Sequence, residues 1–151
     1  MAGGTLSEKI KSKSMSIFEA TKYFGQLVYA IDYIHKNDVV HRDLKPDNIL
    51  ISPKGVLIAD FGVANVKIPK MIIGTKDYMA FEIRKAADEE REEEFTSKAD
   101  VYSLGKISYE MFNGKLPSIY FRDERDLQIH SEDKVPPAIK NLYSKMLKKN
   151  P

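Results

Sequence analysis

The sequence contains no cysteine, and its only histidines are His35, His41 and His130. Without thiols the chain can form neither disulfide bonds nor thiolate metal sites, and so few histidines argue against a histidine-based zinc cluster. No apolar run approaches the ~18 residues that a membrane-spanning helix needs, and no signal-peptide core follows Met1. We therefore expect a protein of the cytosol or nucleus without a membrane span.

An excess of charge of either sign is also lacking. The 24 basic and 22 acidic residues leave a formal net charge of +2, and the basic residues form no stripe with interleaved aromatic side chains. This balance argues against nucleic acid as a partner. Of the 151 residues, 42% are hydrophobic, which suits one globular unit with a buried core.

Two capping boxes, Thr5–Glu8 and Ser16–Glu19, predict helix starts, because in each the hydroxyl and the glutamate satisfy free backbone N–H groups. The first helix is short, and the second carries an apolar stripe to about Lys36. From Thr96 to Phe112 the chain is apolar almost all round a helical axis, which predicts a buried helix.

Other parts of the chain are less regular. A helix is expected after Pro136-Pro137, and a short one within the loop near residues 122–130. Residues 63–78 show no sustained period and predict an irregular loop, and the acidic run 88–94 predicts a solvated insertion.

A β-hairpin is predicted where two apolar runs, Ile49–Ile51 and Val56–Ile58, flank the turn sequence Ser52–Gly55. The two outer ends of a hairpin lie close together. We therefore expect the residues just before the first strand to meet those just after the second.

Polar residues occupy both of these outer ends. Asp43, Lys45 and Asn48 precede the hairpin, and Asp60 follows it. Together they offer a carboxylate base, an ammonium group, and amide and carboxylate oxygens of the kind that bind a hard cation such as Mg²⁺. The pattern predicts a site for acid–base chemistry beside a metal ion.

The residues around this site form ordered motifs. His41–Asn48, with the sequence HRDLKPDN, resembles the catalytic loop of eukaryotic protein kinases, and Asp60–Gly62, DFG, resembles their metal-binding motif. Gly74-Thr75, Tyr78–Glu82 and Asp100–Gly105 follow in the order of that family. The chain thus resembles the eukaryotic protein kinase superfamily, and Lys45 and Thr75 match its serine/threonine branch.

The resemblance implies a mainly α fold with a small β-hairpin, which is the C-terminal helical lobe of the protein-kinase-like fold. The sequence has no G-x-G-x-x-G loop and no Val-Ala-Ile-Lys segment, so we expect the N-terminal β-lobe to be absent. Residues 1–151 would then form a partial kinase domain, with residues 1–5 as a hinge remnant and residues 6–151 as a helical lobe lacking its final helices.

The resemblance also implies roles at the polar site. Asp43 would orient the substrate hydroxyl and accept its proton, and Lys45 would stabilise the transferring phosphoryl group. Asn48 and Asp60 would bind the Mg²⁺ that bridges the phosphates of ATP. ATP and Mg²⁺ are therefore the expected cofactors, and Asp43 and Lys45 are the expected catalytic residues.

Further roles follow from the same resemblance. Leu6 and Leu50 would lie beneath the adenine as cofactor-binding residues, and Thr75 would bind substrate by hydrogen-bonding near Asp43. Asp100 would be a buried anchor that accepts backbone N–H bonds from the catalytic loop. His41 would be a packing residue and not an acid or base.

The expected function is therefore a protein serine/threonine kinase that uses Mg-ATP, with a protein as substrate and a regulatory protein as a further expected partner. The alternative is a catalytically inactive kinase-like module that binds partners or acts as a scaffold. A small-molecule phosphotransferase is disfavoured, because Arg42, Pro46 and the segment from Thr75 to Glu82 match protein-substrate machinery.

Overall fold

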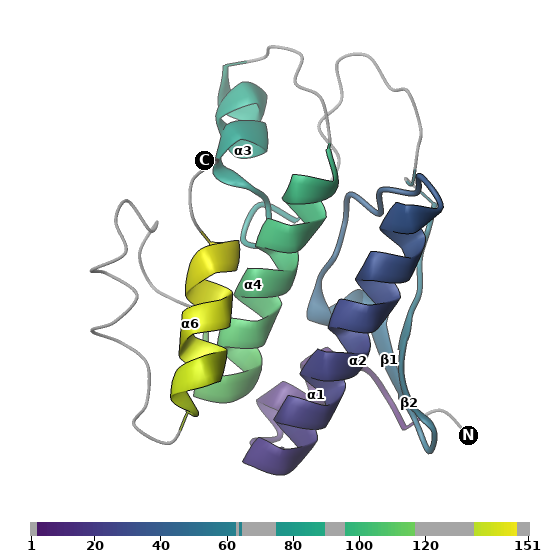
Figure 1. The fold of residues 1–151 in the computed structure, drawn as a ribbon, viewed down its shortest axis with the longest axis vertical. Helices are drawn as coiled ribbons and strands as arrows, with labels where there is room; N and C mark the ends of the chain where they lie inside the picture. The colour runs from purple at the N-terminus through teal and green to yellow at the C-terminus, as the bar shows by residue number, and fades with distance from the viewer. Residues whose placement is uncertain (1–2, 63, 65–74, 90–95, 117–134, 148–151) are drawn as a thin grey trace.

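The computed structural model describes residues 3–62, 64, 75–89, 96–116 and 135–147 (Figure 1). The elements within these ranges are α1 Leu6–Lys11, α2 Ile17–Lys36, the 3₁₀ helix η1 Pro46–Asn48, β1 Ile49–Ser52, β2 Gly55–Ile58, α3 Phe81–Asp88, α4 Ser97–Asn113 and α6 Pro137–Met146. Most of the expected loop over 63–78, most of the acidic run and the expected helix near 122–130 lie outside the described residues.

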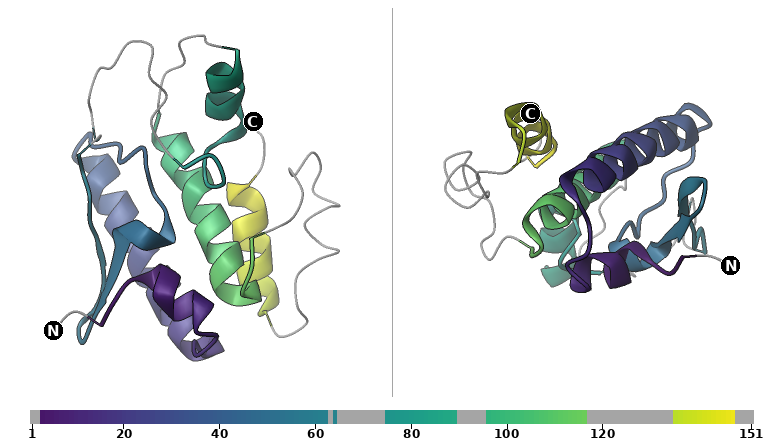
Figure 2. Two further views of the ribbon diagram at one scale, coloured as in Figure 1. Left: turned by 180° about the vertical axis from the view of Figure 1, so that it is seen from behind. Right: turned by 90° about the horizontal axis from the view of Figure 1, so that it is seen from below.

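The fold class is confirmed, because the described residues are mainly helical with one two-stranded antiparallel sheet. Helix α4 packs between α2 and α6, and the hairpin packs against the other side of α2 (Figures 1 and 2). Helix α1 lies across the base of this layer and contacts both η1 and β1. Within the described ranges, no helix has the length and apolar content to cross a membrane.

Both predicted capping boxes are present. Thr5 Oγ1 accepts from the backbone N–H of Glu8 at 3.2 Å, and the Glu8 carboxylate accepts from the Thr5 N–H at 2.9 Å. Ser16 and Glu19 repeat this arrangement at 3.2 and 3.0 Å. An ion pair of 3.1 Å between Lys9 and Glu19 joins α1 to the start of α2. Local sequence therefore sets where both helices begin.

The hairpin has the predicted strands, with Ile49 opposite Ile58 and Ser52 opposite Gly55. The segment just before α1 pairs with β1 on its other side, since Gly3 N–H donates to Ile51 O at 2.6 Å and Ile51 N–H donates to Gly4 O at 2.9 Å. This third line of backbone pairing places α1 directly beside the hairpin.

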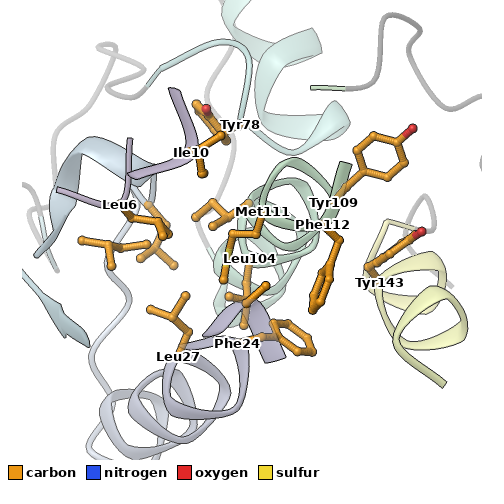
Figure 3. Close-up of a cluster of buried hydrophobic side chains, with 14 of the residues drawn as sticks. Leu6, Ile10, Phe24, Leu27, Tyr78, Leu104, Tyr109, Met111, Phe112 and Tyr143 are labelled. Carbon is orange, nitrogen blue, oxygen red and sulfur yellow. The ribbon is translucent and has the colours of Figure 1, made fainter. Parts of the chain in front are cut away.

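One hydrophobic core joins α1, α2, the hairpin, α4 and α6. Figure 3 shows Leu6 of α1, Leu27 of α2 and Met111 of α4 directed into the same apolar space. Phe24 of α2 meets Phe112 of α4 edge to face, with ring centroids 6.3 Å apart, a favoured aromatic geometry. The core thus fixes α1 beside the hairpin and α4 against α2.

Helix α4 is buried along most of its length, as its apolar sequence predicted. It ends at Asn113, and Gly114 adopts φ 70° as the left-handed cap. Gly105, in the middle of α4, allows α6 to approach closely. A Cβ at this position would lie 2.8 Å from Met146 Cβ and 3.0 Å from Leu147 Cγ.

The substitution Gly105→Ala should therefore destabilise the protein by about 1–3 kcal/mol, since the added methyl group overpacks the α4–α6 interface. Gly25→Ala is the matched control, because Gly25 lies within α2 and a Cβ there meets nothing within 4 Å. We expect Gly25→Ala to stabilise the protein by up to about 1 kcal/mol, because alanine has a higher helix propensity than glycine. Urea denaturation measures both changes; equal midpoints for the two variants would contradict the packing argument.

Candidate active site

The loop that carries the candidate catalytic residues is anchored on Asp100 of α4. Asp100 is only 1% exposed. Its Oδ2 accepts the backbone N–H of His41 at 2.8 Å, and its Oδ1 accepts that of Arg42 at 2.9 Å. The predicted anchor is thus confirmed. Arg42 has a left-handed φ of 72°, a strained conformation for this residue type, and the Asp100 bond holds it there.

A third partner of Asp100 was missed from the sequence. His35, in the last turn of α2, places Nε2 2.9 Å from Asp100 Oδ2. The two residues are 65 positions apart, so no local pattern pairs them. The contact ties the end of α2 and the start of α4 to the catalytic loop.

His41 has the packing role expected of it. Its side chain is fully buried, and both ring nitrogens are engaged: Nδ1 accepts from the Asp43 N–H at 3.3 Å, while Nε2 lies 2.9 Å from Ala59 O. Nε2 must therefore carry the proton that Ala59 O accepts. The ring also packs on Phe61 with centroids 4.8 Å apart. This arrangement leaves no free nitrogen for acid or base chemistry.

Asp43 is at the centre of a network of polar side chains. Its Oδ1 accepts from the Thr75 backbone N–H at 3.0 Å and from the Thr75 hydroxyl at 3.4 Å. Its Oδ2 lies 2.8 Å from Lys45 Nζ and 3.3 Å from Asn48 Nδ2. Lys45 Nζ also donates to the Thr75 hydroxyl at 3.1 Å. Four predicted site residues are thus brought together, and Asp43 is held in one orientation.

Asn48 is oriented by the same loop. Its side-chain NH₂ donates to the Asp43 backbone carbonyl at 2.9 Å as well as to Asp43 Oδ2. These two bonds identify Oδ1 as the atom that Asn48 can offer to a cation. The backbone carbonyl of Asn48 accepts from the Ala59 N–H at 2.9 Å, which ties the loop to the end of β2.

Asp60 is the residue after Ala59, at the same end of the hairpin. Its side chain is exposed, its backbone has a left-handed φ of 64°, and its Oδ1 accepts from the Gly62 N–H at 3.4 Å. Asn48 and Asp60 supply neutral and anionic oxygens, the ligands that suit Mg²⁺. Across the ranges that the structure describes, no group of three or more His, Cys, Asp or Glu side chains could hold a metal ion. Asn48 and Asp60 would therefore suit a Mg²⁺ whose other ligands came from phosphate and water.

The two leucines predicted to contact adenine differ in exposure. Thr5 and Leu50 form a β-bridge, which brings the start of α1 beside β1. Leu50 is half-buried and keeps surface for a ligand, whereas Leu6 is fully buried in the core. The side chain of Leu6 has no exposed surface in this structure, and the roles of both leucines beneath the adenine stay predictions.

The segment from Thr75 to Ala80 is held against α4 by Tyr78. The Tyr78 hydroxyl donates to Glu110 Oε2 at 2.6 Å, and the Ser103 hydroxyl donates to the Tyr78 carbonyl at 2.8 Å. Burial, and then the bond to Glu110, raise the pKa of Tyr78 well above its ordinary value; burial also raises the pKa of Glu110. The sequence did not predict these two bonds. Ser103 lies within the motif Asp100–Gly105 but was given no partner there, and Glu110 lies outside every motif used to find the site.

An anchored loop with a carboxylate, an ammonium group and a hydroxyl, close to two residues whose side-chain oxygens would suit Mg²⁺, is a set of groups compatible with phosphoryl transfer. Residues 1–151 match the family model described as a protein kinase domain. The chain belongs to the protein kinase family.

Its relatives include named protein kinases. CBL-interacting serine/threonine-protein kinase 20 of Arabidopsis thaliana is 34% identical, over 99% of this chain and 36% of that protein. Aurora kinase of Schizosaccharomyces pombe is 36% identical, over 93% of this chain and 41% of that protein. Probable serine/threonine-protein kinase MARK-C of Dictyostelium discoideum is 38% identical, over 78% of this chain and 15% of that protein. The chain spans less than half the length of these relatives.

Proposed function

We propose that this chain carries the catalytic-loop half of a protein serine/threonine kinase, which transfers the γ-phosphoryl group of Mg-ATP to a serine or threonine hydroxyl of a protein. The observation that carries the proposal is the position of Asp43, which is bound at once to Lys45, Asn48 and Thr75. A binding module without catalysis has no chemical need for this arrangement.

Each residue then has a defined task. Asp43 orients the attacking hydroxyl and accepts its proton as the new oxygen–phosphorus bond forms and the bond to ADP breaks. Lys45, 2.8 Å from Asp43, places a positive charge where the phosphoryl oxygens pass. Mg²⁺, when bound, neutralises phosphate charge, and Asn48 and Asp60 are the residues that would hold it.

Thr75 links the segment proposed to bind the protein substrate to Asp43 and Lys45. Its N–H and hydroxyl both reach Asp43, and its hydroxyl also reaches Lys45. It therefore fixes the carboxylate while the segment that follows it is available to a protein substrate. The names of the relatives, which are serine/threonine kinases, support a hydroxyl of serine or threonine as acceptor.

A regulatory protein is a further proposed partner. Two relatives are named for interaction with other proteins, CBL-interacting serine/threonine-protein kinase 20 and Citron rho-interacting kinase of Rattus norvegicus. These names support regulation through protein contacts in the family, and we extend that to this chain without assigning the surface.

Calorimetric titration with ATP tests the metal half of the proposal. We expect binding that depends on Mg²⁺, that is lost in EDTA, and that is weakened at least about tenfold by Asp60→Asn, since loss of a coordinating carboxylate removes a charged oxygen ligand. Asp32→Asn on the exposed side of α2 is the control. Equal affinity with and without Mg²⁺, or in the Asp60→Asn variant, would favour the non-catalytic alternative.

A further inference from the structure

Helix α2 carries large aromatic side chains on the side that faces away from the core. The residues that it buries recur on one face and are Ala20, Phe24, Leu27 and Ile31. On the opposite face Phe18 is 79% exposed, Tyr29 74% and Tyr33 62%. A single exposed apolar residue is common on protein surfaces, but several aromatic side chains aligned on one helix indicate an interaction surface.

This aromatic face is open to a partner. Helix α2 packs against α4 and against β2, and in the view from below it lies along the outer margin of the ribbon (Figure 2). Gly25 lies in the middle of the face, and a Cβ there would meet nothing within 4 Å. Because glycine has no side chain, this position leaves room for a side chain of the partner.

Six exposed residues of α2 follow one line along the helix, because their spacing alternates between four and three residues. We call this set the α2 seam, and its members are Phe18, Lys22, Gly25, Tyr29, Asp32 and Lys36. Residues with this spacing form the narrow stripe along which two helices pair as in a coiled coil. The seam therefore fits a second helix with matching side chains.

The α2 seam is complementary to itself when a second copy runs antiparallel. In a two-fold symmetric interface each contact occurs twice, so a residue that meets another is met by it in return. An axis level with residue 27 places position 22 opposite 32, position 25 opposite 29, and position 18 opposite 36 of the second copy. These three pairs use all six residues of the seam.

Each of the three pairs is chemically favourable. Lys22 meets the opposite charge of Asp32, which within its own chain also pairs with Lys36 at 2.7 Å. The ring of Tyr29 meets the space left by Gly25. The third pair brings the Lys36 ammonium to the Phe18 ring, a cation–π contact.

The opposite orientation is unfavourable. A parallel two-fold pair places each residue opposite its own copy, so that Lys22 meets Lys22 and Asp32 meets Asp32. Like charges placed directly opposite each other repel. The charges of the seam therefore select the antiparallel arrangement.

We propose that the α2 seam is a self-association surface, through which two copies of this chain pair with their α2 helices antiparallel. Three aromatic side chains per copy, at about 150–250 Å² each, place the interface at the small end of specific interfaces, so the dimer is weak and depends on concentration. The catalytic loop follows the C-terminal end of α2. Antiparallel pairing therefore puts the two candidate active sites at opposite ends of the helix pair and leaves both open.

The test is sedimentation velocity on the full-length protein and two charge variants, without ATP or any phosphoryl transfer. We expect the unaltered protein to pass from monomer to dimer between about 1 and 100 µM. In Lys22→Glu, positions 22 and 32 are both negative, and in Asp32→Lys both are positive, so each variant alone places like charges opposite each other twice. Each variant should weaken self-association by about tenfold.

Mixing the two variants tests the antiparallel register itself. In an equimolar mixture, position 22 of each copy faces an opposite charge at position 32 of the other, so the mixture should associate as tightly as the unaltered protein. Recovery would also show that both variants are folded. Lys145→Glu makes the same charge change on the exposed side of α6 and should leave association unchanged. A protein that stays monomeric, variants that associate normally on their own, or a mixture that stays monomeric would each overturn the inference.

Discussion

Replacing Asp43 by asparagine should lower kcat for phosphoryl transfer by about 10²- to 10⁴-fold, the usual contribution of a positioned acid–base group. The amide has nearly the same shape and can still accept the N–H of Thr75. It cannot take the hydroxyl proton, and it loses the charge that pairs with Lys45 at 2.8 Å. Because the proposed role of Asp43 is in the transition state, the loss should appear in kcat and much less in the KM for ATP.

Steady-state kinetics on the full-length protein, with a serine-containing protein substrate, measures this change. Asp38→Asn is the matched control: Asp38 is exposed shortly before the catalytic loop and has a left-handed φ of 57°, which asparagine tolerates. The control should retain wild-type rates. A rate for Asp43→Asn within a few-fold of wild type would remove Asp43 from its role as base.

Local signals explain why much of the fold could be predicted. The capping boxes at Thr5 and Ser16 act within four residues, and they fix the starts of α1 and α2 wherever the chain folds. The hairpin is equally local, since the turn up to Gly55 sets the register of two adjacent strands. A helix apolar on all sides, such as α4, also has only one stable environment, the core.

Helix α3, Phe81–Asp88, was not predicted because its sequence lacks those signals. The helix is only eight residues long, so its apolar positions, Ile83 and Ala86 among them, repeat over barely two turns. The helix packs on a small separate cluster that contains Ala80 and Ala99. Such a helix forms because of tertiary contacts, which outweigh weak local preference.

The candidate site likewise has contacts that the sequence predicts and contacts that it does not. Asp43, Asn48 and Asp60 could be grouped from the sequence because a hairpin brings its ends together. The contact between Asp43 and Thr75, 32 positions apart, was expected only through resemblance to a family. Neither a local pattern nor the resemblance predicted the hydrogen bonds of Tyr78 with Ser103 and Glu110. These residues are far apart in the sequence, so their pairing depends on how α4 crosses the core.

The second large effect concerns stability. Asp100→Ala should destabilise the protein by about 3–5 kcal/mol, because one buried carboxylate accepts the N–H groups of His41 and Arg42 and also contacts His35. Its loss leaves two backbone donors without their acceptor in a buried position, which costs more than the mean value of a hydrogen bond. The strained φ of Arg42 would also lose its support.

Urea denaturation followed by circular dichroism gives the free energy of unfolding for Asp100→Ala and for Asp32→Ala. Asp32 pairs with Lys36 at 2.7 Å on the exposed side of α2, and such i,i+4 surface pairs contribute only about 0.3–0.5 kcal/mol. The two variants remove the same carboxylate, so their difference isolates burial and backbone bonding. Near-equal losses would show that Asp100 does not anchor the loop, and the fixed geometry of Asp43 would then need another cause.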